Sequence, residues 1–200
     1  MPFTAFGTLT GLVIMAIILY GGVQHSFSEL LFWNLHPFHV FLSALATAGM
    51  YRRHSRGGFP ATLLIGYVGS VGIATLSDSL IPYLGEWMMD LPNRELHLGF
   101  IEKWWLVNPL ALAGIVLAYF LPRTKFPHAG HVLLSTWASL FHMTMAMGER
   151  LDLFSAALAA VFLFLAVWVP CCTSDIVFPL LFSGSGSDQG PPSCAAGCID

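Results

Sequence analysis

The chain has 200 residues, of which 56% are hydrophobic and only 10% are charged, and its formal net charge is −3. Soluble domains carry roughly 25% charged residues, so this composition excludes an ordinary soluble fold with a polar surface. The small net charge also leaves no basic surface for nucleic acid. Because a membrane span needs roughly 20 mostly apolar residues, the chain has room for about six transmembrane helices and no large soluble domain.

The N-terminal half is predicted to hold three of these spans. The first, about residues 5–23, lacks the basic leader of a signal peptide and is interpreted as a retained span. The second covers about 30–50 and the third about 59–77, and the loop Tyr51 to Gly58 between them is basic. Small residues let membrane helices approach closely, so those on the third span predict a packing seam formed by Gly66, Gly69, Ser70, Gly72 and Ala74.

An acidic connection is expected after the third span. It contains Asp78, Glu86, Asp90 and Glu95 and is interpreted as too polar to cross a bilayer. Aromatic residues are favoured at the membrane interface, so the stretch Ser79 to Met89 is expected to lie along it.

The C-terminal half is predicted to hold spans at about 98–121, 131–148 and 153–169. The segment 175–182 is too short to cross alone and is interpreted as re-entrant or interfacial. From residue 183 the chain is rich in Gly, Ser and Pro, a composition that cannot bury a core. We therefore expect an all-α membrane domain over residues 1–182, a polytopic bundle of about six helices, followed by a disordered tail over 183–200.

The orientation of the bundle is predicted from its loops. Lysine and arginine are retained on the cytoplasmic side. The two loops that must share one side carry most of them: Arg52, Arg53, Arg56, Arg123 and Lys125. Both termini and the tail are therefore expected to be cytoplasmic, and the acidic connection to face out, in a bacterial-type inner membrane or a plasma membrane.

Ionisable groups inside a bilayer are costly and need a reason. His36 and His39 lie three apart on the second span, roughly 9–14 Å from its outer end at 1.5 Å per residue. His142 lies at a similar depth on the fifth span, Asp78 at the outer end of the third, and Glu102 near the start of the fourth. These five residues predict a transition-metal site for zinc, copper or iron near the outer face.

An alternative for each of these residues is an ordinary hydrogen bond between helices. Pro37, between the two histidines, either kinks the helix or marks its first turn with Asn34 as the cap. A second polar group is expected at the cytoplasmic side. It comprises His54, His128 and His131 in the basic loops, Cys171 and Cys172 at the end of the sixth span, and Cys194 and Cys198 in the tail.

No Gly-rich phosphate loop, G-x-S-x-G elbow or H-E-x-x-H motif occurs in the chain. The leading hypothesis is metal-ion handling or transport across the membrane. One alternative is a membrane-embedded, metal-dependent enzyme acting on a lipid-like substrate, in which Glu102 or Asp78 is the base. Another is a haem b electron-transfer subunit, with His36 or His39 paired to His142. Expected partners are the lipid bilayer and either other membrane subunits or further copies of the chain.

Metal binding at these histidines is expected to depend on pH. Unperturbed histidine titrates near pH 6.5 and must be neutral to bind a cation. Protons and metal then compete for the same nitrogens. Metal affinity is therefore predicted to fall between about pH 7.5 and about pH 5.5, and replacing His142 with Gln to weaken both the binding and its pH dependence.

Overall fold

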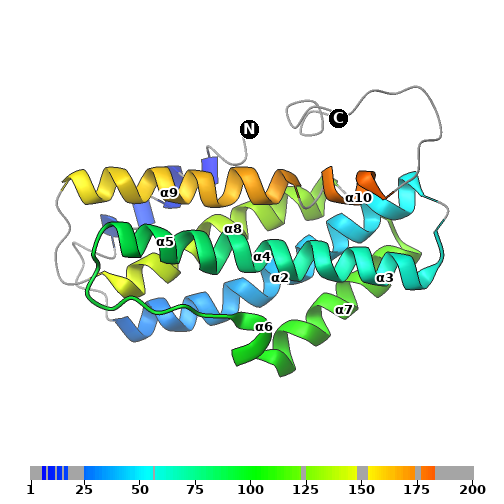
Figure 1. The fold of residues 1–200 in the computed structure, drawn as a ribbon, viewed down its shortest axis with the longest axis horizontal. Helices are drawn as coiled ribbons and strands as arrows, with labels where there is room; N and C mark the ends of the chain where they lie inside the picture. The colour runs from blue at the N-terminus through cyan, green and yellow to red at the C-terminus, as the bar shows by residue number, and fades with distance from the viewer. Residues whose placement is uncertain are drawn as a thin grey trace.

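The computed structural model describes residues 6, 7, 9–11, 13, 14, 16, 17, 25–55, 57–122, 125–147, 153–173 and 177–182. Within these residues the fold is all-helical, with no strand. The elements are α2 (His25–His54), α3 (Phe59–Tyr67), η1 (Val68–Gly72), α4 (Ile73–Thr75), η2 (Leu76–Leu80), α5 (Ile81–Met88), α6 (Gly99–Glu102), α7 (Trp104–Phe120), α8 (Lys125–Ala146), α9 (Leu153–Cys172) and α10 (Phe178–Leu181). The long helices run mostly along the long axis of the molecule (Figure 1).

Helix α2 is the centre of the bundle. It packs against α8 and α7 and also contacts α3, while α9 packs against α8 and α5. Gly114 brings α7 and α2 together, since a Cβ added there would lie 2.6 Å from the backbone oxygen of Phe41. The histidines of α2 are therefore surrounded by helices on several sides.

Helices occur where the spans after the first were predicted. The second, fourth, fifth and sixth expected spans correspond to α2, to α6 with α7, to α8 and to α9. Most of the first expected span lies outside the described residues, as does the tail. The segment expected to be re-entrant or interfacial contains the short helix α10.

The predicted acidic connection is wrong for its first half. Helical structure is continuous from Phe59 to Met88, so Asp78 and Glu86 lie inside a helix and are buried. The physical reason is that both carboxylates accept hydrogen bonds from side chains of neighbouring helices, which removes the cost of placing them there. The irregular connection begins only after Met88 and ends at α6.

The run Phe59–Met88 is the one helix among the described residues that is long and apolar enough to cross a membrane by length and composition. Trp104–Phe120 and Ala157–Pro170 are apolar but shorter. About six spans were expected, and one helix among the described residues satisfies this criterion. Helix α2 has sufficient length, but its histidines, hydroxyl residues and terminal arginines make it more polar.

The predicted seam of small residues is confirmed at four of its five positions. A Cβ on Gly66 would meet Ile115 at 2.8 Å and Ala48 at 3.0 Å, and one on Gly69 would meet Thr47 at 2.7 Å. Gly72 is exposed, with nothing within 4 Å of its added Cβ. The seam therefore joins this helix to α2 and α7, with Gly72 facing away.

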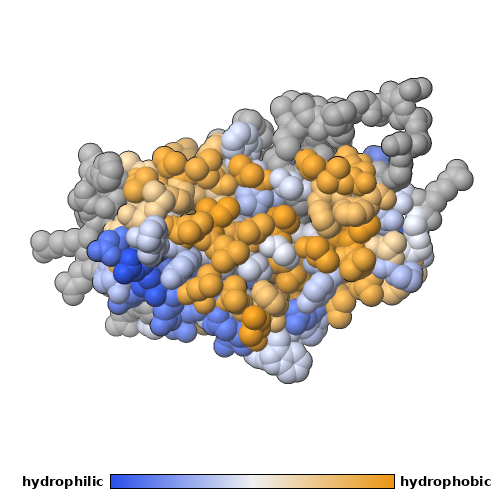
Figure 2. Space-filling model, in the orientation of Figure 1, coloured by the Kyte–Doolittle hydropathy of each residue, from blue (hydrophilic) through white to orange (hydrophobic). Residues whose placement is uncertain are grey.

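Ionisable side chains lie inside the bundle, and large apolar side chains lie on its outside. Fully buried ionisable residues are His36, His39, Asp78, Glu86, His131 and His142. Large apolar side chains on the outside include Leu64, Trp87, Trp104, Phe120, Val161 and Leu181. Figure 2 shows apolar residues spread over the face of the bundle, with hydrophilic residues gathered at one end, over the segment that joins α5 to α6.

Candidate metal centre

His36, His39 and Asp78 form a buried cluster between two helices. The Nδ1 atoms of His36 and His39 lie 2.8 Å and 2.6 Å from the same oxygen, Oδ2 of Asp78. One donor atom from each residue lies within 4.8 Å of the others. This group could hold a metal ion, because imidazole nitrogen and carboxylate oxygen are ordinary ligands of zinc and related ions.

Helix α2 positions both imidazoles on one face. Residues three apart on an α-helix are neighbours, so the spacing of His36 and His39 directs both rings toward Asp78. Pro37 lies inside α2 without ending it. Asn34 donates its side-chain amide to the carbonyl of Leu30 at 2.6 Å, so the alternative in which Asn34 caps a helix starting at Pro37 is wrong.

Asp78 lies in η2, a segment of π-helix within the long run Phe59–Met88. Single π turns inside α-helices occur frequently at functional sites, because the extra residue changes where side chains point. The hydroxyl of Ser139 in α8 donates to the carbonyl of Ser77 at 2.9 Å. This bond connects the π segment to α8 beside the centre.

The Asp78 carboxylate is fully hydrogen-bonded by its neighbours. Ser77 and Ser135 donate their hydroxyls to Oδ1 at 2.7 Å and 2.9 Å, while the two imidazoles occupy Oδ2. Each imidazole that donates from Nδ1 to this carboxylate is held in one tautomer and one orientation. The arrangement therefore fixes the orientation of all three side chains, whereas an imidazole that binds an ion through Nδ1 must carry its ring proton on Nε2.

The charge of the cluster favours a cation. Imidazoles must be neutral to bind a cation, and in that state the cluster carries a net charge of −1, which is costly to bury without compensation. Ligand atoms at about 2.0–2.1 Å from a tetrahedral zinc ion lie roughly 3.3 Å apart. The Nδ1–Oδ2 separations of 2.8 and 2.6 Å must then widen by roughly 0.5–0.7 Å, with the ring protons on Nε2.

Gly99 closes the other side of the His36 ring. A Cβ built on Gly99 would collide with Nε2 of His36 and would lie 2.5 Å from its Cδ2. The backbone at the start of α6 therefore lies directly against this imidazole. With its Nε2 edge covered, His36 has Nδ1 as the nitrogen that faces the other two ligands.

The structure places His142 with Glu86 and not with the cluster around Asp78. Its Nδ1 lies 2.6 Å from Oε1 of Glu86, and both side chains are buried. Glu86 was expected in the acidic connection, within the stretch Ser79 to Met89 along the membrane interface, and it was not among the expected site residues. The available signal was the apolar and aromatic sequence from Ile81 to Met88, which continues the preceding helix.

Glu102 lies at the surface, apart from Asp78. Its Oε1 accepts a hydrogen bond from the backbone N–H of Leu98 at 2.6 Å, and its Oε2 lies 3.2 Å from Nδ1 of His97. His97 was also missed by sequence reasoning. Lys103 lies over the ring of Trp33, 5.4 Å from its centroid, at the same end of the bundle.

The histidines expected at the cytoplasmic side do not form one group. His54 is exposed and its Nδ1 bonds to the carbonyl of Met50 at 3.0 Å. His131 is buried in α8, with its ring centroid 5.3 Å from that of His39 and 5.4 Å from that of His128. The side chains of all four cysteines lie outside the described residues.

No protein-family model, curated protein or solved structure matches this chain at a significant level. The site is therefore interpreted from its own geometry.

Proposed function

We propose that this chain is a multi-pass membrane protein that handles a transition-metal ion at a centre formed by His36, His39 and Asp78. The observation that carries the proposal is the buried Asp78 oxygen shared by two imidazoles from one helix, at 2.8 and 2.6 Å. Zinc, copper and iron all accept this donor set.

The distribution of polarity supports the membrane part of the proposal. Among the described residues, the bundle buries histidine, aspartate and glutamate side chains and exposes Leu, Phe and Trp around its outside. A soluble protein rarely exposes so much contiguous apolar surface, whereas lipid accepts it. About six helices would cross the bilayer in this arrangement, with the basic ends of α2 and α8 at the cytoplasmic face. The shorter apolar helices would be accommodated by local thinning or by tilt of their neighbours.

A row of imidazoles favours transport over a purely structural site. From His39 the next ring is His131, and the next is His128, near the start of α8 at the basic end of the bundle. Because each imidazole in this row contacts the next, the row offers successive ligands to a moving cation. In this proposal the ion passes from the centre toward the cytoplasmic side.

The enzymatic alternative rests on the number of ligands. Three protein donors leave one position of a tetrahedral ion open, and catalytic zinc sites use that position for water.

The haem alternative is less compatible with the packing, because the buried ring of Phe32 contacts both His36 and His142, with centroids 5.5 and 5.3 Å away. A Soret band after haem-replete expression would restore it.

Metal binding to purified protein in detergent tests the proposal. We expect a tightly bound zinc or cobalt ion at the centre, lost in the double variant His36→Ala, His39→Ala and weakened by at least roughly tenfold in Asp78→Asn. The control is His54→Gln, which removes an exposed histidine outside the cluster.

Flux measurements then separate transport from catalysis. In proteoliposomes we expect uptake of radioactive zinc by the wild type and background uptake by the double variant. Metal binding without flux would contradict transport, and unchanged metal binding in the double variant would contradict the centre itself.

A further inference from the structure

A second group of imidazole and carboxylate side chains lies at the end of the bundle where α5 leads into α6. It comprises His142 on α8, Glu86 on α5, and His97 in the connection. His142 Nε2 and Glu86 Oε2 are buried and have no hydrogen-bond partner among the described residues. Buried polar atoms are seldom left without a partner, and each costs free energy when it is. Both atoms are therefore available to bind a ligand.

The hydrogen bond to Glu86 prepares His142 to bind a cation. With Nδ1 donating to Oε1 of Glu86 at 2.6 Å, the lone pair lies on Nε2. A histidine that donates one ring nitrogen to a carboxylate and binds metal through the other is the usual arrangement in metal sites. Glu86 is thus a positioning residue for His142. The Glu86 carboxylate, which is hydrogen-bonded through Oε1 alone among the described residues, also adds a negative charge to the site.

His97 supplies a second imidazole beside the first. Its ring centroid lies 5.4 Å from that of His142, and the two rings are inclined at 71°. Carboxylates approach both nitrogens of His97, with Glu102 3.2 Å from Nδ1 and Glu95 3.8 Å from Nε2. Two imidazoles with adjacent carboxylates make a donor set suited to a divalent first-row metal.

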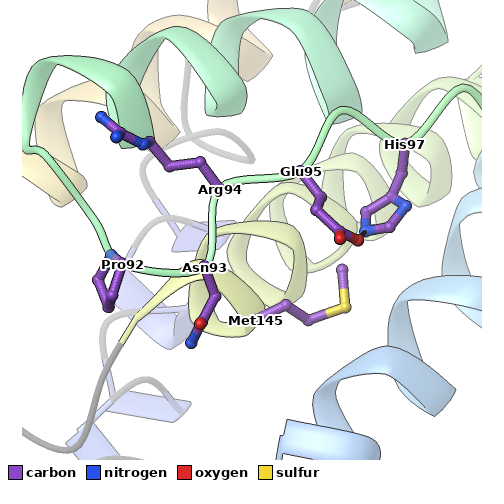
Figure 3. Close-up of a pocket in the computed structure, with 6 residues that line it drawn as sticks. All are labelled: Pro92, Asn93, Arg94, Glu95, His97 and Met145. Atoms are coloured by element: carbon purple, nitrogen blue, oxygen red, sulfur yellow. Dashed lines mark ion pairs between the residues drawn. The ribbon is translucent and has the colours of Figure 1, made fainter.

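A surface pocket leads to this set. It has a volume of about 540 Å³ and is lined by Pro92, Asn93, Arg94, Glu95, His97 and Met145. In Figure 3 the carboxylate of Glu95 lies beside the His97 ring, and the Met145 side chain extends toward them. Met145 follows His142 by three residues on α8, so it lies on the same side of that helix. His97 therefore stands between the pocket and the buried His142.

The same residues lie one ring away from the metal centre. Phe32 contacts His36, His97 and His142, with ring centroids 5.5, 5.9 and 5.3 Å away. The Phe32 side chain is fully buried among these three imidazoles. Phe32 is therefore the ring that His36 and His142 both contact.

We propose that His142 and His97, with His142 positioned by Glu86, form an entry site that takes a divalent transition-metal ion from the pocket and passes it to the centre. The proposal rests on the proposed function, since the centre is the destination of the ion. A carboxylate already in contact with His97, from Glu95 or Glu102, completes the ligands. The pocket lies at the end of the bundle predicted to face outward.

The test is the number of metal ions bound to the full chain in detergent, measured with zinc and with cobalt. We expect two equivalents in the wild type and in the control His54→Gln. His142→Gln should retain only the centre, and the double variant His36→Ala, His39→Ala should retain only the entry site. Glu86→Gln keeps a polar partner for His142 and should weaken the entry equivalent without removing the centre.

The rate at which metal loads into the centre is a second measurement, and a purely structural role of His97 would leave this rate unchanged. His97→Ala alters a partly exposed residue, so it provides a variant that folds if His142→Gln does not. It should lose the entry equivalent and slow the loading of the centre by roughly tenfold, with the equilibrium affinity of the centre unchanged.

The outcomes distinguish the two proposals. One equivalent in the wild type that survives His142→Gln and His97→Ala would overturn the entry site and leave the centre standing. One equivalent that is lost in these variants and kept in the double variant would overturn the centre. No bound metal in the wild type would overturn both.

Discussion

At the scale of single residues, Gly99 has the most restricted position near the centre. Its α-carbon lies against the His36 ring, and any side chain there would occupy the space of Nε2 and Cδ2. Asp78 and His39 cannot move aside to accommodate a shifted His36, because they are buried and joined to each other by a hydrogen bond. Glycine at position 99 is therefore required by packing against a candidate ligand.

Gly99→Ala is expected to displace His36 or the start of α6. We expect destabilisation of about 1–3 kcal/mol, the usual cost of overpacking, together with weaker metal binding at the centre. Thermal unfolding and cobalt titration in detergent would measure the two effects. Gly72→Ala is the matched control, because no atom lies within 4 Å of its added Cβ and it should unfold at or above the wild-type temperature. Wild-type stability and affinity in Gly99→Ala would show that the contact is not restrictive.

At the scale of elements, the long helix Phe59–Met88 and its π segment decide where Asp78 points. The π turn η2 contains one residue more than an α turn and is followed directly by α5. The two buried carboxylates that contact histidines, Asp78 and Glu86, both belong to this helix. A change in the π turn should therefore move Asp78 while leaving the helices on either side in place.

Deleting Leu76 is expected to turn the π turn into an α turn. The flanking helices keep the same faces toward the bundle, but Asp78 shifts along the axis by about 1.5 Å and turns away from α2. We predict a folded protein that has lost the metal of the centre, measured by circular dichroism and metal content. Leu76→Ala, which keeps the residue count, should retain the metal. A deletion variant with full metal content would mean that the π turn does not position Asp78.

At the scale of the whole molecule, the two ends of the bundle differ in charge and in architecture. One end carries the basic residues that finish α2, and the other carries the acidic connection with the pocket. In the membrane arrangement proposed above, the positive-inside rule places the pocket on the outer side. This orientation matches an entry site that collects ions from outside.

Labelling from outside the cell should distinguish the two ends. In a background with the four native cysteines replaced by serine, Asn93→Cys should react with a membrane-impermeant maleimide in intact cells. His54→Cys should react only after the membrane is opened. Both side chains are exposed, so the difference reports on sidedness alone. The reverse pattern would invert the orientation, and equal labelling of both in intact cells would contradict the membrane-spanning arrangement.

Several features of the fold and the centre were predictable from the sequence. The apolar segments of the second to sixth expected spans correspond to helices, because helix formation follows local composition and run length. The pairing of His36 with His39 was also predictable, since their spacing places both on one helix face. Asp78 was expected near them because it lies at a similar depth, at the outer end of the third expected span; the same argument also placed His142 and Glu102 there, which the structure does not.

The sequence by itself therefore determined an all-helical chain, with its helices near the expected positions. It also indicated five candidate ligands, His36, His39, His142, Asp78 and Glu102, of which the structure brings His36, His39 and Asp78 together. Only the tertiary structure decided which carboxylate meets which imidazole. Asp78 bonds to His36 and His39, Glu86 bonds to His142, and Glu102 stays at the surface beside His97. The physical reason is that such pairs depend on how helices pack and on one extra residue in a π turn, and neither leaves a periodic signal in the sequence.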